Sequence, residues 1–434
     1  MEINLENYEL DDNNLSFTVT GQTIDDGSAS ISTYKEMNVT RYLNGIFLDA
    51  IRRKVSDIHF EPYADLFRIR FRIDGIMQHI DTTPKSFGHL LTTRLKVIAG
   101  LDISEQRLTQ NGRFKLRLSE TDALDFRCSL TPTMHGETCV LRLLYLSENM
   151  LELGQLGLNA TQITPIKMAL NRQQGMILVT GPTGSGKTVT LYTLIKYLNK
   201  QPRNIYTVED PIEIDLSGVN QVSVADRLSF SDAARSLLRQ DPDVIMLGEM
   251  RDEETIDTAI KAAHTGHLVL STLHANTAPK VLPRLRNLGV SAYDISSTVT
   301  LVISQRLLRK LDPENREAIT LPKERLLALG FKEEELKDLQ LYRARPGSHS
   351  SENIGYKGRT GIFQIMPINK TLAEMIAKGA TDAEISQYIK IQGFNDLRRS
   401  ALDKVKAGVT DIDEVERVLG ALEIDEHLLE VEGE

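Results

Sequence analysis

The chain has 434 residues, of which 41% are hydrophobic and 26% are charged, and its formal net charge is −9 at pH 7. This length predicts two or three domains, and the composition is typical of a globular protein. The negative charge argues against broad binding to nucleic acid. No apolar stretch approaches the roughly 20 residues that span a bilayer. The first residues do not resemble a signal peptide, so we expect membrane association only through a partner or a surface patch.

The first part of the chain predicts a polar lead-in followed by an α+β domain. Residues 1–35 are rich in Asp, Asn, Ser and Thr, and we expect little regular structure there. Helical spacing over residues 39–54 and 87–99 predicts two helices. Alternation of apolar and polar residues predicts strands over residues 57–61, 66–73, 76–80, 113–118, 124–130 and 138–144. We therefore assign residues 36–146 to one α+β domain.

The pattern changes after a predicted linker at residues 147–162. Short apolar strands are predicted over residues 176–180, 204–209, 244–247 and 268–272, and helices between them over residues 189–199, 230–239 and 255–264. This alternation predicts a parallel sheet covered on both faces. We assign residues 163–306 to this α/β domain. From residue 307 onward we expect a mostly helical region with an irregular insert at about 312–358.

The first strand of the α/β domain runs into the sequence G-x-x-x-x-G-K-T at residues 181–188. Glycines allow backbone N–H groups to surround phosphate oxygens, and the following helix adds a partial positive charge. Lys187 is expected to reach the β- and γ-phosphates, and the Thr188 hydroxyl to bind Mg²⁺. A chance glycine-rich turn is the alternative. The predicted nucleotide-binding residues are Gly181, Pro182, Thr183, Gly184, Ser185, Gly186, Lys187, Thr188 and Val189.

Acidic residues follow two later strands. Residues 243–249 form an apolar strand that ends at Glu249, which we assign as the candidate general base. Residues 208–213 place three carboxylates within five positions, Glu209 and Asp210 among them. A solvated acidic turn is the alternative, but such oxygen atoms suit Mg²⁺ beside a nucleotide. The predicted Mg²⁺ ligands are Thr188, Glu209, Asp210 and Glu249.

Histidines flank the strand at residues 268–272. Either His267 or His274 can position the γ-phosphate, although a lone histidine is more often structural. We rank His274 first, because it follows the strand and therefore lies at the edge where ligands bind. The candidate catalytic set is Glu249, Lys187, Glu209 and His274. The first domain contributes many arginines, which surface ion pairs or phosphate contacts would explain.

Four motifs in order and spacing resemble the secretion ATPase superfamily of bacterial type II secretion and type IV pilus assembly. The phosphate loop is the first. Residues 206–213 resemble the family's aspartate box, residues 238–252 its Walker B region, and residues 265–276 its histidine box. Residues 56–62 and 70–75 are similar to the family's N-terminal domain. The resemblance extends from about Val55 to Leu419.

This resemblance implies a fold, an activity and partners. The fold would be a RecA-like P-loop NTPase core with a mostly parallel sheet, preceded by a smaller α+β, PAS-like domain and followed by a helical C-terminal part. ATP and Mg²⁺ would be bound between the two domains of a homo-hexameric ring. Arg127 and Arg142 align with family arginines that contact the phosphates, and Arg239 matches an arginine of the ATPase core. We assign these three arginines and His267 to nucleotide binding.

The implied activity is an ATPase motor that powers the assembly of type IV pili or type II secretion pseudopili. Its partner would be an inner-membrane platform protein, which would hold a cytoplasmic ring at the membrane without direct contact to nucleic acid. A pilus retraction motor and a DNA-transfer ATPase of the same superfamily are the alternatives. A nucleotide-binding scaffold without turnover is a further alternative that the acidic residues disfavour.

The sequence departs from the family pattern at three places. The insert at 312–358 contains no cysteine, whereas assembly members of the family usually carry a four-cysteine zinc site there, so no zinc is expected. Residues 1–35 are too short and polar for an additional docking domain. The family's Gln-Asp-Gly-Arg stands here as Gln110-Asn111-Gly112-Arg113, so we assign no role to Asn111.

Overall fold

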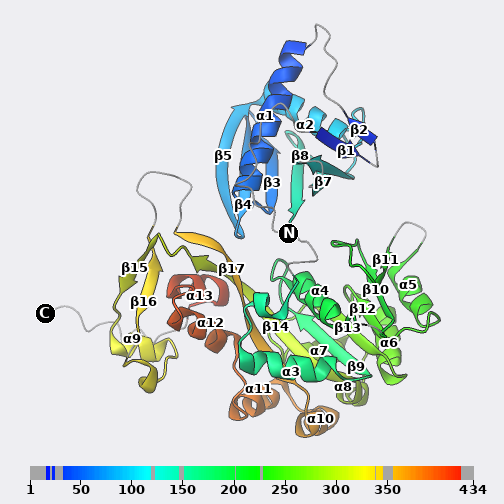
Figure 1. Cartoon of the computed structure of the whole chain (residues 1–434), viewed down its shortest axis with the longest axis vertical. Helices are drawn as coiled ribbons and strands as arrows, with labels where there is room; N and C mark the ends of the chain where they lie inside the picture. The colour runs from blue at the N-terminus through cyan, green and yellow to red at the C-terminus, as the bar shows by residue number, and fades with distance from the viewer. Residues whose placement is uncertain are drawn as a thin grey trace, which may run out of the picture. The chain divides into compact units, whose positions relative to one another are not determined.

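A computed structural model describes residues 16–19, 22–24, 33–118, 123–145, 151–200, 202–224, 228–337, 339–345 and 355–421. The chain divides into two compact units, residues 1–147 and 148–434, and each has its own sheet and core (Figure 1). Most of the predicted lead-in, the start of the predicted linker and part of the predicted insert lie outside the described residues. The finer division into five segments stays a prediction.

The first unit is an antiparallel sheet with two helices, in agreement with the predicted α+β domain. Its strand order is β2-β1-β6-β7-β8-β3-β4-β5. The elements are β1 Ser16–Val19, β2 Gln22–Ile24, α1 Thr33–Arg52, β3 Asp57–Pro62, β4 Leu66–Ile73, β5 Ile76–Pro84, α2 Lys85–Ile98, β6 Gln110–Arg117, β7 Ala123–Thr133 and β8 Gly136–Leu144.

One face of this sheet packs on α1 and α2. The helix residues Leu43, Phe47 and Leu95 share one buried cluster with Phe60 and Phe126 of the strands. Along β4 and β7, buried residues alternate with half-buried ones, as expected for a sheet with one covered face. The other face therefore carries the alternate, polar positions.

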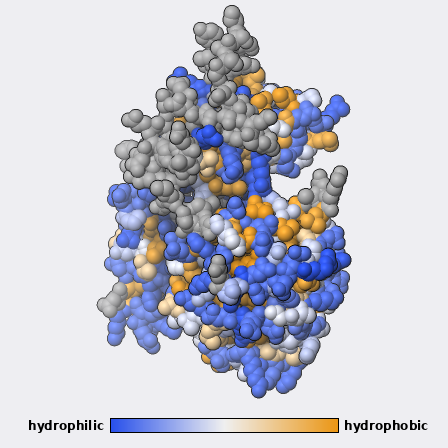
Figure 2. All heavy atoms as spheres, turned by 45° about the vertical axis from the view of Figure 1, so that its right-hand side comes forward, coloured by the Kyte–Doolittle hydropathy of each residue, from blue (hydrophilic) through white to orange (hydrophobic). Residues whose placement is uncertain are grey.

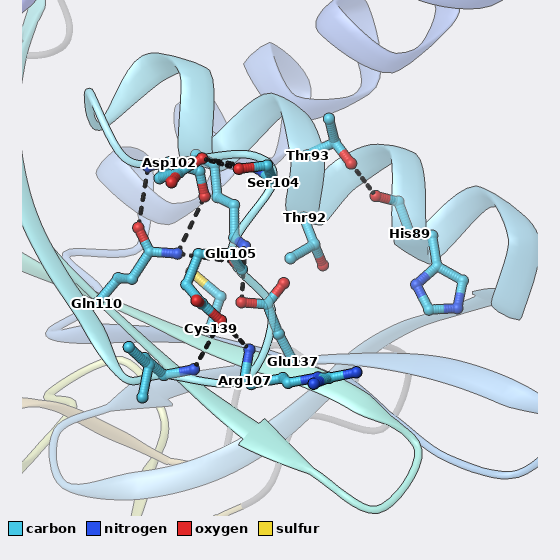
Figure 3. Close-up of polar contacts among 12 residues, drawn as sticks. His89, Thr92, Thr93, Asp102, Ser104, Glu105, Arg107, Gln110, Glu137 and Cys139 are labelled. Carbon is cyan, nitrogen blue, oxygen red and sulfur yellow. Dashed lines mark hydrogen bonds and ion pairs between the residues drawn. The ribbon is translucent and has the colours of Figure 1, made fainter.

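A loop between α2 and β6 is fixed by polar side chains (Figure 3). The Gln110 amide accepts a hydrogen bond from the Asp102 N–H at 2.9 Å and donates to the carbonyls of Asp102 and Glu105, each at 3.0 Å. Gly112 follows on β6, where a Cβ atom would lie 2.6 Å from the carbonyl oxygen of Ala99. Two residues of the Gln110-Asn111-Gly112-Arg113 motif therefore have a structural role in this loop.

A buried ion pair joins the same loop to the β7–β8 hairpin. Lys96 on α2 is 1% exposed, and its Nζ lies 2.7 Å from Oε1 of Glu137 and 2.5 Å from the carbonyl oxygen of Glu105. Removal of one member of such a pair leaves a buried charge, which costs more than an exposed pair contributes. The pair thus fixes α2 against β8.

The second unit contains a seven-stranded sheet of order β11-β10-β12-β13-β9-β14-β17. All neighbouring pairs are parallel except β14 and β17. Its first elements are η3 Leu153–Leu156, α3 Ala160–Leu170, β9 Gly175–Thr180, α4 Lys187–Leu198, β10 Ile205–Glu209, β11 Asn220–Ser223, α5 Phe230–Leu237, β12 Val244–Leu247, α6 Glu253–His264, β13 Leu268–Leu273, α7 Val281–Asn287 and α8 Ala292–Thr298. The predicted mostly parallel sheet is confirmed.

Every residue of β9, β12 and β13 is buried, which requires cover on both faces of the sheet. Apolar residues of α5, α6, α8 and α10 join residues of these strands in one core. Because the three strands run parallel, their carboxyl ends, at Thr180, Leu247 and Leu273, meet along one edge.

The last part of the chain is more regular than predicted. Its elements are β14 Val299–Leu311, β15 Arg316–Ile319, α9 Lys323–Ala328, η4 Glu333–Glu335, β16 Leu341–Ala344, β17 Tyr356–Pro367, α10 Lys370–Ala377, α11 Asp382–Ile391, α12 Leu397–Lys406 and α13 Ile412–Leu419. Helices α10–α13 confirm the helical C-terminal part. The sequence analysis missed β14 and β17, and the expectation of an irregular insert was wrong, because β15 and β16 pair there and α9 packs into a small apolar core.

No helix among the described residues is both long and apolar enough to cross a bilayer. On the face drawn in Figure 2, hydrophilic residues dominate the coloured surface, and apolar residues form separate small groups. Among the described residues, the large apolar side chains with the greatest exposure are Met134, Ile391, Tyr293 and Met168, which come from distant parts of the sequence. Isolated exposure of this kind is ordinary for a protein surface.

Candidate nucleotide-binding and hydrolysis site

The phosphate loop connects β9 to α4 and has a conformation that requires glycine. Gly181, Gly184 and Gly186 have φ angles of 152°, 78° and 87°. A Cβ atom on Gly181 would lie 2.5 Å from Oγ of Ser185 and 2.6 Å from the carbonyl oxygen of Gln305. Because β9 is buried and α4 begins directly at Lys187, the loop lies at the carboxyl edge of the sheet, with the helix N-terminus beside it.

The Lys187 ammonium folds back over the beginning of the loop. Its Nζ donates hydrogen bonds to the carbonyl oxygens of Gly181 at 2.9 Å and Pro182 at 3.1 Å. Burial lowers the pKa of Lys187, and the nearby Glu249 carboxylate opposes this shift. Thr188 and Val189 follow in the first turn of α4, half-buried. The amino group is therefore placed where the β- and γ-phosphates of a nucleotide would lie.

Glu249 is held at the same edge by the neighbouring strand β13. The Thr272 hydroxyl donates to the Gly248 carbonyl at 2.8 Å, and the Met250 N–H donates to the Thr272 carbonyl at 3.2 Å. The two residues flanking Glu249 are thus both bonded to Thr272. The Glu249 side chain itself is 23% exposed and forms an ion pair with Arg251. This arrangement leaves a partly solvated carboxylate close to Lys187, as a general base or metal ligand requires.

His274 lies beside Glu249, with Nε2 4.0 Å from Oε2 of that carboxylate. Its segment is fixed by Thr180, whose hydroxyl accepts from the Ala275 N–H at 2.8 Å and lies 2.9 Å from the carbonyl oxygens of Leu273 and Ala275. Burial, and then the Lys187 charge, lower the pKa of His274. This shift favours the neutral imidazole, which can both donate and accept hydrogen bonds.

Glu209 ends β10 but points into the protein. It is 4% exposed. Oε1 accepts from the Thr207 hydroxyl at 2.6 Å and from the Gln221 amide at 3.0 Å, while Oε2 accepts from the Tyr192 hydroxyl. Both carboxylate oxygens are therefore already used in hydrogen bonds within the protein. Its predicted catalytic and metal-binding roles stay predictions.

Tyr192 lies on α4, one turn after the phosphate loop, and it connects this helix to the acidic segment. The buried hydroxyl donates to Glu209 and accepts from the backbone N–H groups of Glu213 at 3.0 Å and Ile214 at 3.3 Å. Burial, and then the Glu209 charge, raise its pKa. Sequence reasoning missed this residue, because nothing local indicates that a tyrosine in an apolar helix bonds a strand end.

Asp210 and the core arginines are more accessible. The Asp210 side chain is 48% exposed and its Oδ2 lies 3.8 Å from the Arg251 guanidinium. Arg251 thus bridges Asp210 and Glu249. Arg239 follows α5 and is exposed; its predicted nucleotide contact stays a prediction.

Gln305 on β14 is a second residue that sequence reasoning missed. It is 2% exposed; its Nε2 donates to the Ser185 carbonyl at 2.7 Å and its Oε1 accepts from the Thr190 hydroxyl at 2.8 Å. One side chain therefore holds the loop and the first turns of α4 together. No local pattern around Gln305 indicated this role, because both of its partners lie more than 100 positions away in the sequence.

Three further predicted nucleotide contacts come from other parts of the chain. His267 precedes β13 and bonds the Ala262 carbonyl through Nδ1 at 2.9 Å, so it lies at the amino edge of the sheet, opposite the loop. Arg127 and Arg142 belong to the first unit, where they are opposite each other on β7 and β8. Arg142 also donates to Oδ1 of Asp57 at 2.9 Å. Their predicted contacts with nucleotide stay predictions.

Mg²⁺ usually binds through one or two carboxylates, substrate phosphates and water rather than through a dedicated protein cage. The residues at this edge, Thr188, Glu249 and the exposed Asp210, fit that requirement. In the parts of the chain that the structure describes, there is no group of three or more His, Cys, Asp or Glu side chains suited to hold a metal by themselves.

The sequence of this chain is similar to those of known secretion and pilus ATPases. The family model described as "Type II/IV secretion system protein" matches residues 33–417. The type IV pilus assembly ATPase PilB of Acinetobacter baylyi is 45% identical over 415 residues, covering 95% of this chain and 72% of that protein. The type II secretion system ATPase E of Vibrio cholerae is 41% identical over 382 residues, covering 88% of this chain and 75% of that protein.

Solved structures give the same fold. The crystal structure of the pilus retraction motor PilT with bound ADP is 26% identical, covers 88% of this chain and 97% of that chain, and superposes with a TM-score of 0.59. The ATPase DotB of Legionella pneumophila is 20% identical, with a TM-score of 0.63 over 87% of this chain and 94% of that chain. The RecA-like fold predicted from the sequence is confirmed.

Proposed function

We propose a motor function for this chain, which belongs to the family of type II and type IV secretion system proteins and is an ATP hydrolase of that family. In this proposal it is a Mg²⁺-dependent motor that drives the assembly of type IV pili or type II secretion pseudopili. The observation that carries the proposal is the meeting of Lys187, Glu249 and His274 at one sheet edge. The name of the Acinetobacter baylyi relative supports an assembly role, and that of the Vibrio cholerae relative supports a role in type II secretion.

In the proposed reaction, the phosphate loop and Lys187 bind the β- and γ-phosphates of ATP. Glu249 accepts a proton from the attacking water, and neutral His274 orients the γ-phosphate or that water by hydrogen bonding. Mg²⁺, when bound, neutralises phosphate charge and would be held by Thr188, with Glu249 and Asp210 near it, directly or through water. We propose a structural role for Glu209, since its oxygens are engaged by Thr207, Tyr192 and Gln221.

We further propose that the working form is a homo-hexameric ring, held at the inner membrane by a platform protein. A head-to-tail ring places identical interfaces around one axis, so each site can gain residues from a neighbour. Arg127, Arg142, Arg239 and His267 are candidates for such contributions. Assembly is favoured over retraction because the assembly ATPase relative is 45% identical to this chain and the retraction motor 26%.

The test is the ATPase rate per chain, measured against protein concentration with Mg²⁺ and with EDTA. The proposal predicts a rate that needs Mg²⁺ and rises with concentration as rings form. A Mg²⁺-dependent rate that stays constant per chain from nanomolar to micromolar concentration would contradict the ring. DNA-stimulated activity that weakens with salt would instead favour a DNA-transfer ATPase.

A further inference from the structure

A cavity of about 600 Å³ lies within the second unit, beside the beginning of the phosphate loop. Its walls come from loop residues 181–183, from the segment that follows β13, from α7 and from the first residue of α11. Besides Thr183 of the loop, its charged or hydrogen-bonding side chains are His274, Asn276, Lys280, Arg284, Asn287 and Asp382. We call it the α7–α11 cavity. None of the residues assigned above explains why cationic side chains gather on its α7 side.

The position of Lys187 indicates which end of a nucleotide would face this cavity. Its ammonium bonds the carbonyls of Gly181 and Pro182, and both residues line the cavity. A phosphate-loop lysine reaches the β- and γ-phosphates. If ATP binds as proposed above, on which this inference rests, its terminal phosphate lies at the opening of the cavity.

The cavity is held open by the protein itself. Thr180 bonds Ala275, and an Arg306 N–H donates to the Asn276 carbonyl at 2.9 Å. The Ala278 N–H, two residues farther on, donates to the Gln364 side chain at 3.0 Å. The wall between the loop and α7 is therefore fixed on both sides without a ligand.

The charges that line the α7–α11 cavity favour weak, reversible binding of a small anion. Lys280 and Arg284 are exposed and lie one helical turn apart. Arg284 and His274 line the same cavity, and the Arg284 charge, after burial, Lys187 and Arg251, is a minor cause of the lowered pKa of His274. Asp382 adds one negative charge on the α11 side. Clefts with an excess of one charge raise the local concentration of opposite ions.

We propose that the α7–α11 cavity binds the inorganic phosphate released by ATP hydrolysis, with Lys280 and Arg284 as its cationic ligands. Hydrolysis converts ATP and water into ADP and phosphate; the cavity receives the phosphate after it separates from ADP, beyond His274. Asp382 limits the affinity and thereby permits release. The site is distinct from the γ-phosphate position, so it can be occupied while a triphosphate fills the loop.

The test uses inorganic phosphate as the probe and the full chain saturated with Mg²⁺ and a non-hydrolysable ATP analogue. Phosphate binding is measured by ³¹P NMR line broadening, which needs no turnover. We expect binding to persist with the analogue present. It should weaken about fivefold in the double variant Lys280→Gln/Arg284→Gln, the size expected for exposed ionic contacts, and strengthen in Asp382→Asn. The double variant Lys370→Gln/Arg325→Gln, which removes two exposed charges outside the cavity lining, is the matched control.

Two results would overturn the inference. Complete loss of phosphate binding on addition of the analogue would place the phosphate in the γ-phosphate position. Equal binding by the wild type, the cavity variant and the control would remove Lys280 and Arg284 as ligands. Failure of the analogue itself to bind would contradict the proposed function, while the same variants still decide the phosphate site on the nucleotide-free chain.

Discussion

Two neighbouring parallel strands, β10 and β12, lead to glutamates whose surroundings differ. Glu209 is 4% exposed, and its carboxylate accepts hydrogen bonds from three neighbouring side chains. The Glu249 side chain is 23% exposed and lies near Lys187 and His274. The comparison teaches that an acid at a strand end is a candidate for chemistry only when its oxygens remain accessible to substrate. In the proposed function, the first glutamate would organise the site and the second would react.

A large loss of activity is expected at Lys187, which precedes both glutamates in the sequence and lies near Glu249. Lys187→Ala removes the ammonium at the beginning of the loop, and we expect turnover to fall about 10³-fold, as for loss of a charged group at the transferred phosphate. Steady-state ATPase rates measure this. Activity within tenfold of the wild type would refute the placement of phosphate at Lys187.

The substitution Glu209→Gln tests the difference between the two glutamates by its effect on the free energy of unfolding. The glutamine places an amide NH₂ where a buried oxygen accepted hydrogen bonds, so we expect unfolding free energy to fall by about 1–3 kcal/mol. Glu249→Gln should change it by less than about 1 kcal/mol, since the Glu249–Arg251 pair is partly exposed. Urea unfolding of the two variants compares them directly. Equal losses of unfolding free energy in the two variants would contradict the assigned difference in burial and hydrogen bonding.

Tyr192→Phe tests the contact that buries Glu209. Loss of the hydroxyl leaves Glu209 and the N–H groups of Glu213 and Ile214 each short of a partner, with an expected cost of about 1–2 kcal/mol. Because the acidic segment is then less fixed, we also expect a higher Mg²⁺ requirement for turnover. Tyr197→Phe, on the same helix, is the control. Identical Mg²⁺ titrations for both variants would leave Tyr192 with only a structural role.

The smallest effect concerns a third carboxylate, in the C-terminal region. Hydrogen bonds from Arg399, the main cause, hold the pKa of Glu335 at about 2 against an ordinary value of 4.5. A lowered pKa in the folded state means that this stabilisation is present above pH 4.5 and is lost as pH falls toward 2. We expect Arg399→Gln to lose about 1 kcal/mol or less at pH 6 and to show a weaker decline between pH 5 and 3.5. Parallel urea titrations of Arg398→Gln provide the control, and equal slopes would contradict the assignment.

Features that depend on interactions between residues close in sequence were predicted, and features that depend on residues far apart in sequence were not. The phosphate loop, β12 and its following Glu249 depend on local patterns, so their positions were predictable from the sequence. The burial of Glu209 depends on Tyr192 and Gln221, which only the fold brings to it. The same is true of Gln305, 120 positions from the Ser185 carbonyl that it bonds.

The sequence analysis missed strand β14 for a different reason. Residues 299–305 are all buried, so no alternation marks them as a strand, and a continuous apolar run cannot be distinguished from a buried helix by periodicity. Its antiparallel partner β17 lies beyond the insert, so no neighbouring sequence indicated that the two segments pair as strands. His267 and His274 lie at opposite ends of β13, as their flanking positions in the sequence indicated, and the predicted nucleotide contact of His267 stays a prediction.

The most direct test of the account is the pairing of nucleotide binding with single-turnover hydrolysis in Glu249→Gln. The account predicts ATP binding within a few-fold of the wild type and hydrolysis slowed by about 10²–10⁴-fold, the contribution of a general base. The same experiment on Glu209→Gln should leave most of the hydrolysis rate in the folded fraction. Wild-type-like hydrolysis by Glu249→Gln, or a greater loss in Glu209→Gln, would contradict the division of roles between these two glutamates.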